Sequence, residues 1–206
     1  MGITLGHKSY VSHSGYGYSK RRCEDITSWF ITTFYPRHKL EVDIIHKGLK
    51  REGALGYCDW IGETRPPREF EIELDTNMDE ELYTKTLLHE LFHMMQWING
   101  SLKRKRCKMY FRDESVDNYD YEDQPHEIAA RAAEESLYEQ YMTKDKLSHS
   151  TSQGGVCPYI IDSYGIKLCN SDLINKLVLM HYQNTIRVRS SFLQVVARLL
   201  LLLWML

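Results

Sequence analysis

Residues 89–93 read His-Glu-Leu-Phe-His, an H-E-x-x-H pattern. On a helix, His89 and His93 lie one turn apart on the same face, so both imidazoles can reach one zinc ion at about 2.0–2.1 Å. Glu90 then lies beside the ion rather than on it. Because zinc lowers the pKa of a bound water toward about 7, Glu90 can accept a proton from that water and prepare it to attack a carbonyl. The pattern predicts metal-assisted hydrolysis with Glu90 as the catalytic base.

The spacing matters only if the segment is helical, and residues 78–98 contain neither proline nor glycine. Asn77 is the predicted N-cap, with Glu80 three residues later as an approximate capping box. Gly100 is a predicted stop. The apolar residues recur at helical spacing: Leu82, Leu87, Leu88, Leu91, Phe92, Met95 and Trp97. A buried helix with merely satisfied histidines is the competing interpretation. We favour the metal, because burying these polar groups costs free energy unless something pairs them.

A catalytic zinc site needs a third protein ligand and one open position, so the pattern is incomplete. No histidine follows His93 at the metzincin spacing. The downstream candidates are Glu127, His126, Glu134 and His149. We favour Glu127, because it falls in the first turn of a predicted alanine-rich helix that can approach the 78–98 helix closely. Alternatively, Glu127 only interacts favourably with the positive N-terminus of its own helix.

Two stretches together resemble a known family. Leu87–His93 is followed by Gln124-Pro125-His126-Glu127-Ile128-Ala129-Ala130, and this pair is similar to the SprT-like and phage-encoded zinc metallopeptidases. The resemblance covers roughly residues 23–142. It implies His89, His93 and Glu127 as zinc ligands and Glu90 as general base. The family's cysteine-rich zinc ribbon has no counterpart here, so the resemblance does not carry a DNA-linked role to this chain.

Composition excludes several classes of protein. The chain has 206 residues, 43% of them hydrophobic, which fits one domain with a hydrophobic core. Its net charge of −2 argues against non-specific electrostatic binding of the whole protein to nucleic acid or to a membrane surface. The odd set of five cysteines forms no C-x-x-C pair, which argues against a disulfide scaffold. No secretory signal is recognisable at the N-terminus. We therefore expect a cytoplasmic protein with reduced cysteines.

The predicted elements give an α+β fold, a minimal zincin-like domain. A helix over 23–35 and strands over 39–49, 53–61 and 68–75 precede the 78–98 helix, and a ligand-bearing helix runs from Pro125 to Met142. We expect the first helix to pack on a small, twisted, mostly antiparallel sheet. Residues 1–20 are predicted to be flexible, 21–143 to form the domain, 144–156 a linker and 157–206 a helical extension. Residues 101–123 are expected to form a long loop.

Two charged or apolar runs have alternative interpretations. The run Lys103–Lys108 could contact nucleic acid, but we favour a solvated helix end. The apolar run 199–206 is far shorter than the roughly 20 residues that span a bilayer. We expect 190–206 to be a docking helix rather than a membrane span.

The predicted function is zinc-dependent peptide hydrolysis, with a peptide or protein substrate extended along the exposed edge of the sheet. Candidates for stabilising the oxyanion are Tyr119, Tyr121, Tyr138 and His149. Two alternatives stay open. One is a zinc-stabilised, non-catalytic binding module in which His126 or His149 takes the fourth ligand position. The other is a nucleic-acid adaptor that uses Lys103–Lys108.

Overall fold

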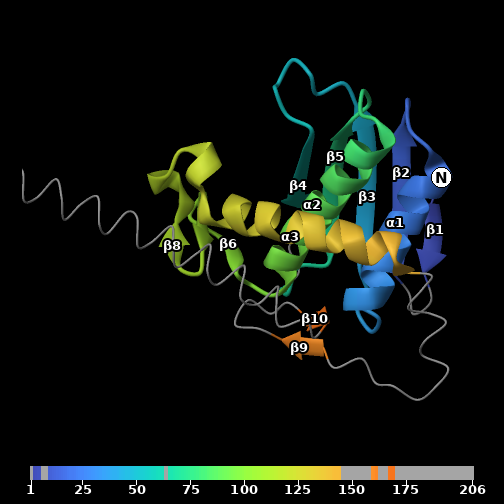
Figure 1. Ribbon diagram of the computed structural model, residues 1–206. Helices are drawn as coiled ribbons and strands as arrows, with labels where there is room; N and C mark the ends of the chain where they lie inside the picture. The colour runs from blue at the N-terminus through green and yellow to red at the C-terminus, as the bar shows by residue number, and fades with distance from the viewer. Residues whose placement is uncertain (1, 6–8, 63–64, 145–158, 162–166, 170–206) are drawn as a thin grey trace, which may run out of the picture.

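The computed structural model describes residues 2–5, 9–62, 65–144, 159–161 and 167–169 (Figure 1). Its main sheet has the strand order β1-β2-β3-β5-β4. These strands are β1 (Gly2–Leu5), β2 (Ser9–Gly15), β3 (Glu41–Lys47), β4 (Gly56–Trp60) and β5 (Glu69–Asp75). The three helices are α1 (Lys20–Phe34), α2 (Glu80–Ile98) and α3 (Pro125–Met142). The predicted α+β class is confirmed.

The sheet is mixed, which corrects the expectation that it would be mostly antiparallel. Strands β2, β3 and β5 run parallel to one another, and only the outer strands β1 and β4 pair antiparallel. The helix α1 makes β2 and β3 parallel, because it is the crossover between them. Strands β1 and β2 also lie in the region 1–20 that was predicted to be flexible. The buried face of β2 carries Ser9 and His13 beside Val11, so no apolar alternation marks the strand.

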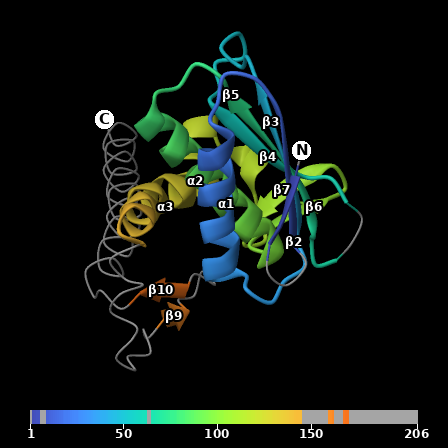
Figure 2. The ribbon, with the colours of Figure 1, turned by 90° about the vertical axis from the view of Figure 1, so that its right-hand side faces the viewer.

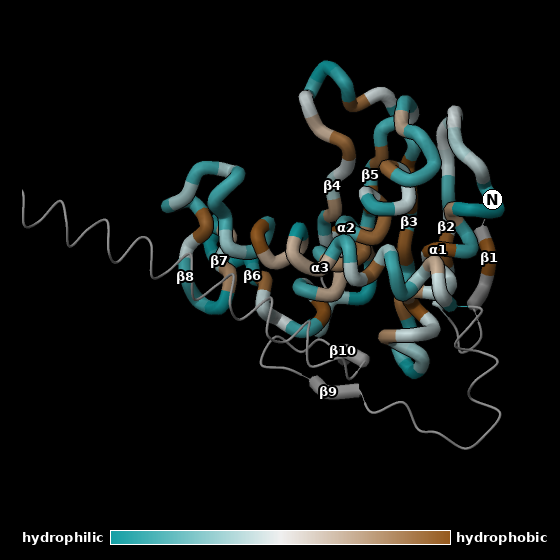
Figure 3. Tube along the Cα trace, viewed as in Figure 1, coloured by the Kyte–Doolittle hydropathy of each residue, from teal (hydrophilic) through white to brown (hydrophobic). Residues whose placement is uncertain are grey.

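The helices form two layers on one face of the sheet. Figure 2 shows α1 and α2 next to the sheet, with α3 on the far side of α2. The core contains Phe30 of α1, Ile44 of β3, Ile72 of β5 and Leu91 of α2, all fully buried. Figure 3 shows apolar residues gathered in the central strands and in α2, whereas the segments near β8 are mostly hydrophilic. Burial of this apolar surface holds α2 in place beneath the sheet.

The start of α2 differs from the predicted one. The N-cap is Asp79, whose side chain accepts a hydrogen bond from the Leu82 N–H at 2.9 Å. Asn77, the predicted cap, instead donates its backbone N–H to Asp75 at 3.1 Å. Three acidic residues in a row made either register plausible, since Asn and Asp cap equally well. Gly100 follows the helix with φ +74°, a conformation that suits glycine.

Residues 101–123 are not a long loop. They form a three-stranded antiparallel sheet, β6 (Leu102–Lys105), β7 (Lys108–Phe111) and β8 (Glu114–Ser115), followed by short 3-10 helices η1 (Val116–Asn118) and η2 (Tyr121–Asp123). Arg106 and Cys107, both with positive φ, make the tight turn between β6 and β7. The hairpin was not predicted from the sequence, because its turn contains no glycine and non-glycine residues with positive φ are uncommon in such turns.

Most of the predicted linker (144–156) and of the helical extension (157–206), including the 190–206 helix, lies outside the described residues. The described exceptions are Lys144 and a two-stranded ribbon, β9 (Tyr159–Ile161) and β10 (Lys167–Cys169). Over the described residues, no helix has the length and apolar character needed to cross a bilayer. The predicted domain boundaries stay predictions.

Candidate metal centre

The middle of α2 and the first turn of α3 bring His89, His93 and Glu127 together. The Nε2 atoms of His89 and His93 are 3.1 Å apart. The Glu127 carboxylate lies 3.4 Å from each of them, through Oε2 to His89 and Oε1 to His93. All three potential ligand atoms lie within 4.8 Å of one another, so the group could hold a metal ion.

The spacing of these atoms fits a tetrahedral ion. Ligand atoms bound at about 2.0–2.1 Å with tetrahedral angles are about 3.3–3.4 Å apart. The observed separations of 3.1–3.4 Å fall close to that edge length. Two imidazoles and one carboxylate also form the donor set of known catalytic zinc sites. The residues present therefore fit a zinc ion, although other divalent ions accept the same donors.

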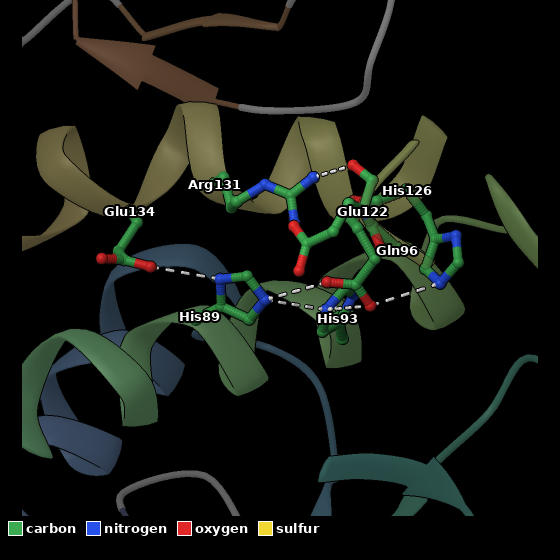
Figure 4. A network of polar contacts seen from close by, with 8 residues as sticks. His89, His93, Gln96, Glu122, His126, Arg131 and Glu134 are labelled. Carbon is green, nitrogen blue, oxygen red and sulfur yellow. Dashed lines mark hydrogen bonds and ion pairs between the residues drawn. The ribbon is translucent and has the colours of Figure 1, made fainter. Parts of the chain in front are cut away.

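Each histidine is oriented by a hydrogen bond at its other ring nitrogen. His89 Nδ1 lies 3.2 Å from Glu134 Oε2, and His93 Nδ1 lies 2.9 Å from Gln96 Oε1. Figure 4 shows Glu134 beside the His89 ring; it contacts Nδ1, whereas Glu127 contacts the other ring nitrogen, Nε2. An acceptor at Nδ1 keeps the proton there and leaves Nε2 free for a metal. Both Nε2 atoms consequently face Glu127.

Gln96 also links the two helices. Its Nε2 donates to the backbone carbonyl of His126 at 3.0 Å, while its Oε1 accepts from His93. The side chain is 2% exposed. Because His126 directly precedes Glu127, the Gln96 side chain couples the orientation of His93 to the position of Glu127.

Protonation in the metal-free protein follows from these contacts. Burial acts to lower the pKa of His89, but hydrogen bonds to Glu127 and Glu134 outweigh it and raise the pKa to about 9. Burial acts to raise the pKa of Glu127, and hydrogen bonds from His89 and His93 instead hold it well below its usual range. The metal-free group is thus an imidazolium–carboxylate cluster, from which a bound cation must displace a proton.

Glu90 lies next to this group and is 5% exposed. Burial raises the pKa of its carboxyl, which His93 and His89 partly oppose. Its side chain lies against Gly56 of β4. A Cβ added at Gly56 would lie 2.7 Å from Glu90 Oε1 and 2.9 Å from Glu90 Cγ. Only glycine therefore lets the Glu90 carboxylate occupy this position beside the edge strand.

These residues line a cleft of about 490 Å³. Its walls come from β4, β5, α2, the β6–β7 hairpin and the segment that leads into α3. Its lining includes Glu90, His93, Glu127, Tyr121 and His126. A cleft of this size is typical of a small-molecule or peptide site.

The four predicted oxyanion stabilisers have different positions. Tyr121 lines the cleft; partial burial, followed by the charge of Glu127, raises its pKa to about 12. Tyr119 donates to Glu114, and the Tyr138 ring lies beneath the Lys85 ammonium at 4.9 Å. His149 lies outside the described residues. Of the three described tyrosines, Tyr121 is the one in the cleft lining.

The remaining candidates for the third ligand also have definite places. Glu134 contacts the far nitrogen of His89 rather than the Nε2 group. His126 is 4% exposed, and its Nε2 lies 3.5 Å from Glu127 Oε1. Burial, followed by the charge of His93, lowers the pKa of His126 to about 4, so it is neutral.

Part of the Lys103–Lys108 run is already paired. Lys103 and Lys105 both contact Asp113, at 3.5 and 3.2 Å, and Arg104 contacts Asp59 at 2.8 Å. These pairs reduce the positive charge available to a nucleic acid. The run forms most of the β6–β7 hairpin rather than the solvated helix end we expected.

Two residues of the site were missed in the sequence. Gln96 follows His93 at i+3, so helical spacing could have placed it on the same face. Gly56 carried no local signal, because its role depends on the approach of Glu90 from a distant helix.

Comparison with protein-family models finds no match, and neither curated proteins nor solved structures contain a match to this chain. The functional argument for this protein therefore rests on its geometry, a His-His-Glu group on two helices that could hold a metal ion.

Proposed function

We propose that the protein is a zinc-dependent peptidase whose metal ligands are His89, His93 and Glu127 and whose general base is Glu90. The observation that carries the proposal is the set of ligand-atom separations of 3.1–3.4 Å, with the buried Glu90 carboxylate beside them in one cleft. The resemblance to SprT-like metallopeptidases in residues 87–93 and 124–130 agrees with it.

Each residue has a definite part in this scheme. A zinc ion, when bound, would polarise the scissile carbonyl and acidify a water, bringing its pKa toward about 7. Glu90 accepts a proton from the attacking water, and its raised pKa brings it closer to the pH at which it must work. It then donates that proton to the leaving amine as the C–N bond breaks. Tyr121, in the cleft lining, is placed to donate a hydrogen bond to the developing oxyanion.

The substrate fits the cleft as an extended strand. Within the described part of the chain, β4 pairs only with β5, so one side of β4 is open. The backbone N–H of Asp75 donates to Leu55 and that of Ile61 donates to Glu69, which places these alternate residues on the β5 side. By alternation, the backbone groups of Gly56, Cys58 and Trp60 face the open side. A peptide strand could pair with them beside Glu90.

The test is hydrolysis of a quenched-fluorescent peptide library by the zinc-loaded protein and by Glu90→Gln. We expect chelator-sensitive cleavage by the parent protein and a loss of about 10²–10⁴-fold in Glu90→Gln, with zinc content unchanged. Equal activity of the two proteins would remove the general-base role. A parent protein that binds zinc and cleaves nothing would refute the peptidase.

A zinc-stabilised binding module without catalysis is the second candidate, and the position of His126 favours it. This buried, neutral imidazole lies 3.5 Å from Glu127 Oε1, near enough to become a fourth ligand after a small shift. In that case His126→Ala lowers zinc affinity and no peptide is cleaved. In the peptidase, His126→Ala leaves three zinc ligands in place.

A further inference from the structure

The face of the sheet away from the helices carries rows of carboxylates. Glu71 of β5 lies directly between Asp43 of β3 and Asp59 of β4 in the strand register. In the next row Glu41 lies opposite Glu69. Like charges directly opposite one another destabilise a sheet, so this arrangement costs free energy in the isolated protein. A partner that supplied positive charge would relieve it.

Only part of this charge is neutralised within the described residues. Lys47 contacts Glu73 at 2.6 Å, and Arg104 contacts Asp59 at 2.8 Å. Glu71 makes no ion pair in the part of the chain that the structure describes, although it lies at the centre of its row. Asp59, Glu71 and Glu73 also belong to the lining of the metal-centre cleft.

The other wall of the cleft is largely apolar, apart from the Arg104 guanidinium, which lies over the Trp97 ring at 5.6 Å. Trp97, Leu102 and Met109 contribute to it, from α2, β6 and β7. Two side chains of the cleft lining also have a buried polar atom, Trp97 Nε1 and His126 Nδ1, with no hydrogen-bond partner among the described residues. Trp97 is 2% exposed. Unpaired buried polar atoms are rare and costly, so both side chains are incompletely satisfied within the described residues.

The two walls lie on opposite faces of the open edge of β4. Tyr57 and Asp59 point to the carboxylate face, in register with Glu73 and Glu71, whereas Gly56 points toward Glu90. A strand added to β4 would present alternate side chains to the two walls. One set would meet Glu71 and Asp59, which already pairs with Arg104, and the other would meet Trp97, Leu102 and Met109.

From this arrangement we infer that the cleft takes an extended polypeptide segment in which lysine or arginine alternates with apolar residues. The basic side chains face Glu71 and Asp59, and the apolar side chains face the Trp97 wall. The inference names the substrate class of the proposed peptidase and rests on that function for cleavage, but not for binding.

Binding is tested separately from hydrolysis, with three short fluorescein-labelled peptides and the zinc-loaded protein. The first has lysines at alternate positions between apolar residues, the second has glutamates there, and the third has the composition of the first with its lysines clustered. Fluorescence anisotropy gives each Kd. We expect the first peptide to bind at least about tenfold more tightly than the second, and this preference to decline with added salt. It should also bind more tightly than the third.

Charge variants locate the contact. Glu71→Gln should weaken binding of the alternating lysine peptide about two- to fivefold, and Glu71→Lys about tenfold, since attraction is replaced by repulsion. The matched control is Glu41→Lys, which makes the same charge change on the same face but outside the cleft lining. It should stay within about twofold of the parent protein. Thermal unfolding and zinc content verify that each variant is folded. If Glu71→Lys does not fold, the binding of Glu71→Gln alone tests the contact.

The outcomes separate the two proposals. Preferential binding of the alternating lysine peptide without its cleavage keeps the docking inference and refutes the peptidase. Cleavage without preference for lysine, unaffected by Glu71→Lys, keeps the peptidase and overturns the inference. Equal binding of the alternating and clustered peptides overturns strand addition in the proposed register.

Discussion

Replacing Gln96 by leucine tests whether the metal centre depends on the contact between α2 and α3. The substitution keeps the approximate volume and removes both hydrogen bonds, to His93 Nδ1 and to the His126 carbonyl. Each buried partner left unsatisfied costs about 1–3 kcal/mol, so we expect the metal-free protein to lose about 2–6 kcal/mol of unfolding free energy. The lost orientation of His93 should weaken zinc binding by about 10–100-fold.

Urea denaturation of the metal-free protein gives the first quantity, and competition with a chromophoric chelator gives the zinc Kd. Gln140→Leu is the matched control, because Gln140 donates to Ser136 within α3 at 3.1 Å, away from the His-His-Glu group. It should change both quantities little. Gln96→Glu retains an oxygen acceptor for His93, so zinc affinity should recover while stability stays low. Zinc affinity of Gln96→Leu within about threefold of the parent value would refute the orienting role of this amide.

Three further predictions follow from the site. Gly56→Ala should lower kcat by about 100-fold with full zinc content, because the alanine Cβ would lie 2.7 Å from Glu90 Oε1 and displace that carboxylate. The control is Gly48→Ala, since an added Cβ there meets no atom within 4 Å. Unchanged turnover of Gly56→Ala would show that Glu90 tolerates the shift. Glu127→Ala should reduce zinc affinity more than about 100-fold in chelator competition. The control, Glu135→Ala, removes only a surface ion pair with Lys85 and should leave zinc affinity unchanged. Tight zinc retention by Glu127→Ala would exclude Glu127 as a ligand. The pKa of His89 is raised to about 9 in the metal-free protein. The free energy of unfolding that protonated His89 contributes is therefore fully present below about pH 6.5, the usual histidine pKa, and is lost as the pH rises through 9. Zinc binding between pH 6.5 and pH 9 should release this proton, so zinc affinity should increase with pH. Calorimetry in buffers of different ionisation heat measures that proton, and its absence would contradict the assignment.

Helical periodicity was sufficient to place His89, Glu90 and His93 correctly, because the relation between i and i+4 is local to one helix. Alternation of apolar and polar residues likewise placed β3 and β5, apolar residues after a glycine turn placed β4, and Pro125 with the alanines that follow it placed α3. The strand β2 was missed because polar Ser9 and His13 lie on its buried face. His13 is accommodated there by Tyr18 and Glu24, which only the folded chain brings near.

Long-range packing decided the rest of the site. Glu127 was chosen from four candidates by its place in a helix, but its distance from His89 depends on how α3 packs across α2. The tie through Gln96, the approach of Glu90 to Gly56 and the row of carboxylates across β3, β5 and β4 each join segments far apart in the chain. No local pattern encodes such contacts, since they follow from the burial of many apolar side chains at once.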